Sequence, residues 1–175
     1  MKHRRPPRLP RESYLGAARI FLTMCTFERN QYFRDAARAE QVRSQLLQTA
    51  LDYGVDVIAY CLMWDHVHAL FTGLTESADN RMCADRFRQI SSFHFGRSFA
   101  STLWQEGYYD RALRDEESTL DVVAYIVLNP VRAGLCARAI DYPYVGSSRY
   151  SVAELVTATE WRPHDAGLKP SRYGP

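Results

Sequence analysis

The stretch VDVIAYCLMWDHVHALFTG, residues 55–73, decides the fold of this chain. Residues 55–62 are apolar and β-branched, and an apolar run resumes at residues 66–72 after a break of three residues. Two such segments in close succession predict a pair of antiparallel strands joined as a hairpin. Gly73 follows the second strand and is expected to end it.

Further elements on either side of the hairpin are predicted from residue periodicity. Residues 17–26 are mostly apolar and predict a strand, whereas residues 35–53 carry small and apolar residues at helical spacing. After the hairpin, residues 77–99 predict a second, arginine-bearing helical region that should end near Gly96.

The remaining elements complete the predicted order. Residues 104–114 are expected to be irregular or briefly extended. A third helix should open at Ser118 or Thr119, and it cannot run regularly through Asn129-Pro130. This order predicts a single-domain α+β fold in which helices pack on an antiparallel sheet.

Length and composition favour one compact soluble domain. The chain has 175 residues, of which 46% are hydrophobic and 24% charged, close to the norm for globular proteins. Its longest nearly uninterrupted apolar stretch, residues 57–64, is far shorter than the roughly 20 residues of a membrane span. The four cysteines form no C-x-x-C pair and are expected to be ordinary buried thiols. We therefore expect a cytoplasmic protein with no membrane partner.

Positive charge is concentrated at the N-terminus. Residues 1–11 hold five of the 22 basic residues and no acidic residue, which leaves 17 basic and 20 acidic residues elsewhere. This proline-rich segment cannot form a helix, so it is either a solvated tail or an arm that orders along a phosphate backbone. The candidate backbone contacts in the arm are Lys2, Arg4, Arg5, Arg8 and Arg11, joined by Arg81, Arg86, Arg88 and Arg97 if these share an accessible face.

The segment His66-Val67-His68 is the sharpest local feature. Because side chains alternate along a strand, both imidazoles should lie on one face with their Cα atoms about 6.6 Å apart. Two such rings can share one divalent ion. The same spacing also fits two structural histidines that are hydrogen-bonded at the margin of the core.

A second pair of polar residues, Tyr125 and Asn129, is spaced by four and should share one face of the third helix. A tyrosine hydroxyl is a poor nucleophile at its ordinary pKa of about 10, so its use on a phosphate requires a metal ion or nearby cations. The alternative is a half-buried tyrosine with its hydroxyl at the surface, followed by an asparagine that terminates the helix.

Three segments together resemble one family. CLMWDHVHALFTG (61–73) is similar to the M-P-N-H-V-H-L-L segment of single-tyrosine HUH transposases of the insertion-sequence type. WQEGYYDRALRDEE (104–117) and YIVLNPVRAGL (125–135) resemble the signature of the REP-associated tyrosine transposases, as does DYPYVGSS (141–148). The resemblance covers roughly residues 14–150. It leaves residues 1–13 as a basic arm and residues 151–175 as a C-terminal tail.

This resemblance implies both a fold and a reaction. The fold would be a ferredoxin-like or RRM-like sandwich with the histidine strand central in its sheet. Tyr125 would attack a DNA phosphate to form a 5′-phosphotyrosine, and His66, His68 and Asn129 would bind Mg²⁺ or Mn²⁺. Arg132 would lie near the scissile phosphate. The substrate implied is single-stranded hairpin DNA from repeated palindromes, and relatives are monomers or homodimers.

The chain departs from the family pattern immediately before the histidines. Trp64-Asp65 replaces the family's Pro-Asn, which could bring an extra carboxylate near the metal. We expect Asp65 to hydrogen-bond a metal-binding residue or to be structural, and we expect the same of Asp110, which lies in the matched segment 104–117. Two other functions stay open at this point: a hairpin DNA or RNA binding module with little or no cleavage, and an interaction protein with structural histidines.

Overall fold

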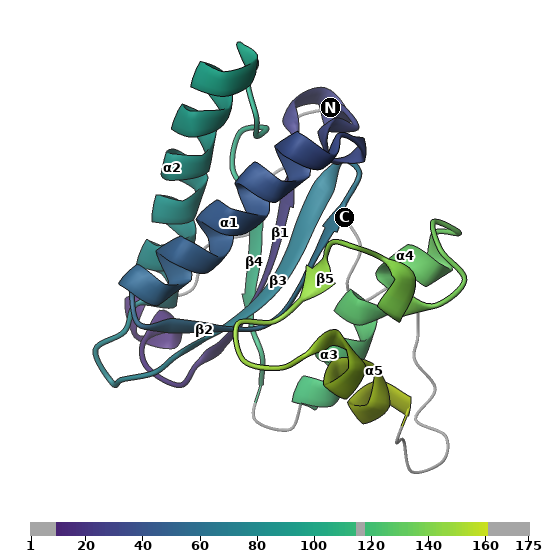
Figure 1. Cartoon of the computed structure of the whole chain (residues 1–175). Helices are drawn as coiled ribbons and strands as arrows, with labels where there is room; N and C mark the ends of the chain where they lie inside the picture. Colours follow the sequence, from purple (N-terminus) through teal and green to yellow (C-terminus); the bar gives the residue numbers. More distant parts are fainter. Residues whose placement is uncertain (1–9, 115–117, 161–175) are drawn as a thin grey trace, which may run out of the picture.

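The predicted hairpin forms the middle of the sheet. The computed structural model describes residues 10–114 and 118–160, and its five antiparallel strands lie in the order β4-β1-β3-β2-β5 (Figure 1). The strands are β1 (Arg19–Cys25), β2 (Val55–Met63), β3 (His66–Gly73), β4 (Tyr109–Ala112) and β5 (Val145–Gly146). The histidine strand β3 is central, between β1 and β2, as the resemblance implies.

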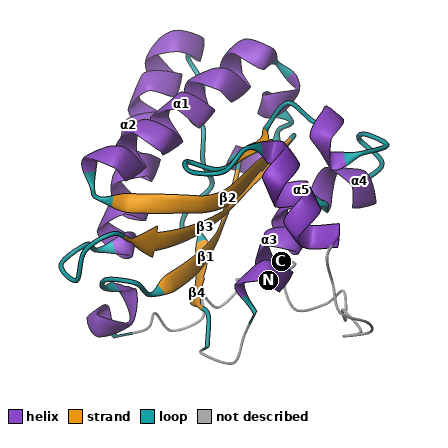
Figure 2. Cartoon of the chain, turned by 60° about the horizontal axis from the view of Figure 1, so that its bottom comes forward, coloured by secondary structure: helices purple, strands orange, loops and turns teal. Residues whose placement is uncertain are grey.

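Helices cover both faces of the sheet. The helices are α1 (Ala36–Asp52), α2 (Asn80–Phe99), α3 (Thr119–Val127), α4 (Asn129–Arg132) and α5 (Val152–Glu160). Four short 3-10 turns are η1 (Arg11–Tyr14), η2 (Phe27–Arg29), η3 (Tyr32–Arg34) and η4 (Ala139–Asp141). Helices α1 and α2 lie on one side of the sheet and α3 and α5 on the other (Figure 2). The predicted α+β sandwich is confirmed.

Side-chain alternation divides the core into two clusters. Along β3, Val67, Ala69 and Phe71 pack beneath α1 and α2. Leu70 packs on the opposite face beneath α3, and His68 stacks there on Phe21. A strand buried on both faces is expected to be almost uninterruptedly apolar, and the one buried polar residue of β3 is His68 at its histidine end.

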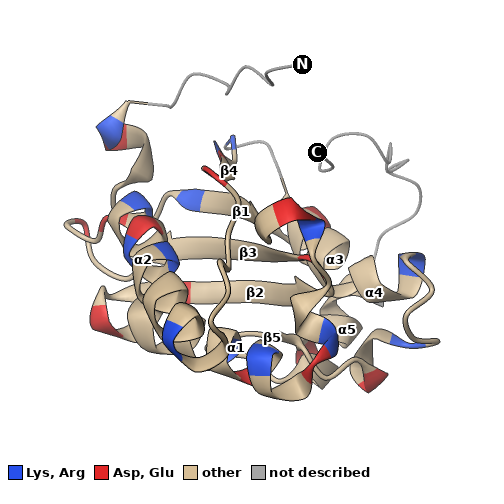
Figure 3. Cartoon of the chain, turned by 90° about the horizontal axis from the view of Figure 1, so that it is seen from above, with Lys and Arg blue, Asp and Glu red and all other residues tan. Residues whose placement is uncertain are grey.

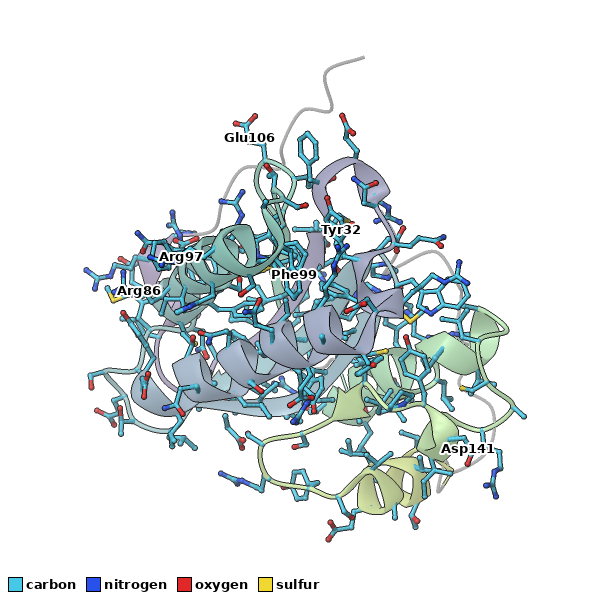
Figure 4. All side chains as sticks on the ribbon, turned by 45° about the horizontal axis from the view of Figure 1, so that its top comes forward. Tyr32, Arg86, Arg97, Phe99, Glu106 and Asp141 are labelled. Carbon is cyan, nitrogen blue, oxygen red and sulfur yellow. The ribbon has the colours of Figure 1, made fainter. Side chains whose placement is uncertain are left out.

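Helix α2 is longer at its C-terminal end than predicted. It begins at Asn80, where the Asp79 carboxylate caps the Met82 amide at 2.9 Å, and it passes Gly96 to end at Phe99. A glycine inside a helix costs about 1 kcal/mol relative to alanine. Packing of the last turn offsets this cost, because the Phe99 ring lies 4.9 Å from that of Phe95. Tyr32 and Phe99 lie in the region where α1 and α2 meet (Figure 4).

Residues 152–160, which the sequence interpretation assigned to a C-terminal tail, form helix α5. Leu155 on this helix is buried in the same cluster as α3, and α5 packs directly on α3. Described residues after 150 are therefore part of the folded domain. The sequence signal was weak because α5 is a short helix stabilised mainly by tertiary packing.

Gly73 is required by a close approach of two backbones. Its amide donates to the Gly16 carbonyl at 2.8 Å, and an added Cβ would overlap that carbonyl and lie 2.8 Å from the Ala78 Cβ. We expect Gly73→Ala to lower the free energy of unfolding by about 2–3 kcal/mol. Gly96→Ala is the control, because its Cβ would meet nothing closer than 3.8 Å and should stabilise the helix by up to about 1 kcal/mol. Urea unfolding curves measure both, and equal effects would contradict this account.

Candidate active site

Two imidazoles meet at the start of β3. The Nε2 atoms of His66 and His68 are 3.2 Å apart, and the rings meet edge to face. The predicted placement on one face of the strand is therefore confirmed. His68 is almost completely buried, whereas His66 lies partly open to solvent.

The second nitrogen of each ring has its own partner. His66 Nδ1 lies 2.6 Å from Asp65 Oδ1, and His68 Nδ1 lies 2.9 Å from the Thr23 hydroxyl on the neighbouring strand β1. A carboxylate accepts hydrogen bonds, so the His66 proton is assigned to Nδ1. This arrangement leaves the Nε2 atom of His66 as an acceptor that points toward His68.

Helix α3 lays Tyr125 over the same face of the sheet. The Tyr125 ring centroid is 5.4 Å from that of His68 and 5.9 Å from that of Phe21. Phe21 is fully buried and stacks on His68 with centroids 5.5 Å apart. The Phe21 ring thus packs against both side chains, and it holds the tyrosine beside the histidine pair.

Burial and nearby cations set the protonation of these groups. Burial lowers the pKa of His68 well below its ordinary value, and the positive charges of Arg132 and Arg29 lower it further. Burial raises the pKa of Tyr125, while Arg132 and a hydrogen bond with Asn129 oppose that rise. His68 is therefore neutral, and Tyr125 retains its hydroxyl proton in the resting protein.

Asn129 and Arg132 approach Tyr125 from α4. The Asn129 side chain hydrogen-bonds the Tyr125 side chain, in keeping with their predicted spacing on one face. Arg132 donates to the Tyr125 carbonyl, and its guanidinium lies 4.7 Å from the centre of the Tyr125 ring. Both residues follow the break at Leu128, which separates α3 from α4. Leu128 keeps αR backbone angles and the Arg132 amide donates to its carbonyl, so Asn129 stays one helical turn from Tyr125.

Asp65 also belongs to the site. Its Oδ2 atom is 3.1 Å from the Arg29 Nε atom, while Oδ1 contacts His66. The hydrogen bond with His66 lowers the pKa of Asp65, and the positive charge of Arg29 lowers it further against the effect of burial. Asp65 is therefore ionised, and it contacts His66 at Nδ1, the ring nitrogen that does not face His68.

The histidine pair fits a shared divalent ion. Two imidazole nitrogens bound at right angles to one ion, each at about 2.1 Å, would be about 3.0 Å apart, close to the observed 3.2 Å. Residues 10–114 and 118–160 contain no cluster of three or more His, Cys, Asp or Glu side chains that could hold a metal. An ion at this pair would therefore take its other ligands from groups such as the Asn129 amide, water or a bound phosphate.

Two predicted residues lie away from the histidine pair. Asp110 pairs with Leu22 in the sheet and accepts a hydrogen bond from Tyr14, on the face covered by α1 and α2. Arg11 is 3.5 Å from Asp79, beyond the opposite end of β3 from His66. The arm residues Lys2, Arg4, Arg5 and Arg8 lie outside the described residues.

The four arginines of α2 do not share one face. Arg81 lies 5.8 Å from the centre of the Tyr14 ring, and Arg88 donates to the Gln105 carbonyl. Arg86 and Arg97 lie on the outer side of the helix (Figure 4), with the exposed Phe93 between them in sequence. Basic positions are spread over several elements rather than gathered on α2 (Figure 3). The condition that the four share an accessible face is not met.

Three residues of the site were not predicted from the sequence. Phe21 and Thr23 point to the histidine face because they alternate along β1 opposite Leu70 and His68. Their roles depend on the pairing register of two strands about 45 residues apart, which no local pattern reveals. Arg29 lies in a loop and carries no periodic signal.

Among the residues that the structure describes, no helix is long and apolar enough to cross a membrane. This agrees with the short apolar runs of the sequence.

Comparison with known proteins points to one family. Residues 17–129 match the family model described as "Transposase IS200 like". A REP-associated tyrosine transposase of Escherichia coli strain K12 is 24% identical over 122 residues, which cover 70% of this chain and 72% of the relative. A Haemophilus influenzae protein named "Putative REP-associated tyrosine transposase" is 27% identical over 127 residues, covering 66% of this chain and 72% of the relative.

A solved structure has the same fold. The structure of a REP-associated tyrosine transposase bound to a REP hairpin superposes with a TM-score of 0.66 at 19% sequence identity. The match covers 80% of this chain and 81% of that chain. The likeness extends over most of the sandwich described above.

Proposed function

This chain belongs to the IS200-like transposase family, and from that premise we propose that it cleaves and rejoins single-stranded hairpin DNA through Tyr125 with a divalent metal ion. The observation that carries the proposal is the meeting of the two Nε2 atoms, 3.2 Å apart, beside the Tyr125 ring. A nucleophile next to a pair of nitrogens that could hold a metal ion is an arrangement suited to phosphodiester transfer.

The proposed covalent step conserves the number of phosphoester bonds. The Tyr125 hydroxyl oxygen attacks phosphorus and gives up its proton to water, while the bond from phosphorus to the 3′-oxygen breaks and that oxygen takes up a proton from water. The products are a 5′-phosphotyrosine and a strand that ends in a 3′-hydroxyl. Attack by a 3′-hydroxyl on the phosphotyrosine reverses the step, so rejoining needs no external energy source.

Side chains of this site would assist that step in separate ways. His66 and His68 would hold Mg²⁺ or Mn²⁺ through Nε2, together with the oxygen of the Asn129 amide. When bound, such an ion polarises a non-bridging phosphate oxygen and stabilises the developing negative charge. Arg132, whose guanidinium lies over the Tyr125 ring, would favour the phenolate and contact the phosphate.

The substrate class rests on the relatives. The solved relative of this fold is bound to a REP hairpin, which supports hairpin DNA as the substrate of this chain. The arm residues Lys2, Arg4, Arg5, Arg8 and Arg11 are proposed to contact the DNA backbone. Reversing their charge should weaken hairpin binding and flatten the dependence of the dissociation constant on salt. An unchanged affinity and an unchanged salt slope would remove the arm from the interface.

The deciding experiment is a search for protein-linked DNA. Single-stranded hairpins from repeated palindromes of the host genome are incubated with the protein in Mn²⁺ or in EDTA, and denaturing gels then reveal covalent adducts. We expect an adduct in Mn²⁺ and none in EDTA. Hairpin binding without any adduct, across many hairpins, would instead identify a binding module that does not cleave.

A further inference from the structure

Arg29 occupies a strained position beside the histidine pair. Glu28 and Arg29 both adopt left-handed backbone conformations, with φ of 52° and 58°, although neither is glycine. Each such residue costs on the order of 1 kcal/mol, so the surrounding contacts must hold the loop in place. The Arg29 side chain reaches back to the end of β1, where Nη1 lies 2.7 Å from the Cys25 sulfur and Nε lies 3.1 Å from Asp65 Oδ2.

The contacts of Arg29 complete a clamp around Asp65. The Asp65 carbonyl accepts from the Thr26 amide at 2.9 Å, and the Thr26 hydroxyl lies 2.9 Å from the same carbonyl and 2.7 Å from the Asn30 carbonyl. One carboxylate oxygen contacts His66 Nδ1 at 2.6 Å, and the other contacts Arg29. The backbone and both carboxylate oxygens of Asp65 are therefore held, which leaves the carboxylate a single orientation.

His66 depends on this clamp more than His68 does. His68 is held by Thr23, by the stack on Phe21 and by nearly complete burial. His66 is partly exposed, and the Asp65 carboxylate is the partner that holds its Nδ1 atom. Carboxylates behind metal-binding histidines fix the ring orientation and the tautomer.

We propose that Arg29 is a positioning residue of the metal site: it fixes the Asp65 carboxylate, which holds His66 Nε2 toward His68. This inference rests on the proposed use of the histidine pair. Arg29 acts through Asp65, so its effect should vanish when Asp65 can no longer form the ion pair. Arg29 is itself a cation and would repel a bound metal ion. If charge alone mattered, removing Arg29 would strengthen Mn²⁺ binding, whereas loss of positioning would weaken it.

The first test uses Mn²⁺ alone and isothermal titration calorimetry. Arg29→Gln should weaken Mn²⁺ binding by about 3- to 10-fold, and Arg29→Lys should recover part of the loss. Arg34→Gln is the charge control, because it removes a cation from the same segment between β1 and α1 that stacks on Trp64 without contacting Asp65, and it should leave Mn²⁺ affinity unchanged. Tighter binding by Arg29→Gln would overturn the proposal, since charge alone would then explain the effect.

A double-mutant cycle tests the route through Asp65. Asp65→Asn keeps an oxygen for His66 but removes the ion pair, so Arg29→Gln should have no further effect on Mn²⁺ affinity in that background. Additive losses would show that Arg29 acts by another route. Arg34→Gln, from the same loop, is the control for loop charge, because Arg34 stacks on Trp64 without contacting the carboxylate.

A measurement on the metal-free protein tests the role of Arg29 independently of the proposed function. Nitrogen-15 imidazole spectra of the metal-free protein should show His66 protonated at Nδ1 in the native chain and in Arg34→Gln, and mixed tautomers in Arg29→Gln. Unchanged His66 spectra in a folded Arg29→Gln protein would overturn the positioning role. Failure of the native chain to bind Mn²⁺ would count against the proposed function but would leave this spectral test intact.

Discussion

Tyr125→Phe is expected to abolish the covalent protein–DNA adduct while leaving hairpin affinity within about twofold. Loss of the nucleophilic oxygen should reduce cleavage by about 10³-fold or more, because phenylalanine has no hydroxyl oxygen that could attack phosphorus. The phenyl ring preserves the packing of position 125 against His68 and Phe21, so the fold should be kept. Denaturing gels measure the adduct, and gel-shift titrations measure binding.

Tyr109→Phe is the matched control for this result. Tyr109 is exposed on β4 and pairs with Thr23, the residue that hydrogen-bonds His68, so it lies on the same face of the sheet. Its hydroxyl should be dispensable for cleavage. An adduct that persists in Tyr125→Phe, or one that disappears only in Tyr109→Phe, would assign the nucleophile to a different tyrosine.

His66→Gln and His68→Gln should each lower Mn²⁺ affinity by about 100-fold or more and abolish adduct formation. Each substitution removes one of the two imidazole nitrogens that face each other across 3.2 Å. The exposed His94 on α2 supplies the control, since His94→Gln should leave both metal affinity and cleavage unchanged. Calorimetry with Mn²⁺ and the adduct assay provide the two measurements.

Stability distinguishes a metal role of these histidines from a structural one. His68→Gln should cost about 1–3 kcal/mol of unfolding free energy, because His68 is buried and hydrogen-bonded to Thr23. His66→Gln should cost less, since His66 is partly exposed. We therefore expect His66→Gln and His68→Gln to weaken Mn²⁺ binding to a similar extent but to lower the free energy of unfolding to different extents. Native Mn²⁺ affinity in a folded His66→Gln protein would favour structural histidines.

Local patterns of the sequence were sufficient to predict the main helices and strands and to predict which residues of one element lie on the same face. Period-two alternation places His66 and His68 on one face of β3, and helical spacing places Tyr125 and Asn129 together. These predictions hold because each depends only on the backbone geometry of a single strand or helical segment. The hairpin of β2 and β3 was predicted in the same way, whereas the full strand order β4-β1-β3-β2-β5 depends on pairing between strands far apart along the chain.

Predictions that depended on one residue type were less secure. Gly96 was expected to end α2, but the burial of Phe95 and Phe99 carries the helix past it to Phe99. Likewise, the four arginines of α2 were candidate backbone contacts only if they shared an accessible face, and their angular positions separate Arg81 and Arg88 from Arg86 and Arg97. Tertiary packing outweighs the preferences of single residues at such positions.

The sequence by itself determined the sandwich and the chemically distinctive side chains, because these are properties of short segments with a defined period. Only the tertiary structure decided that α3 lies over the histidine end of β3, that Thr23 and Phe21 support His68, and that Arg29 holds Asp65. It also decided that Asp110 faces the other side of the sheet. These relations join residues far apart along the chain, and they arise from the strand register and the packing of the whole core, which no local spacing encodes.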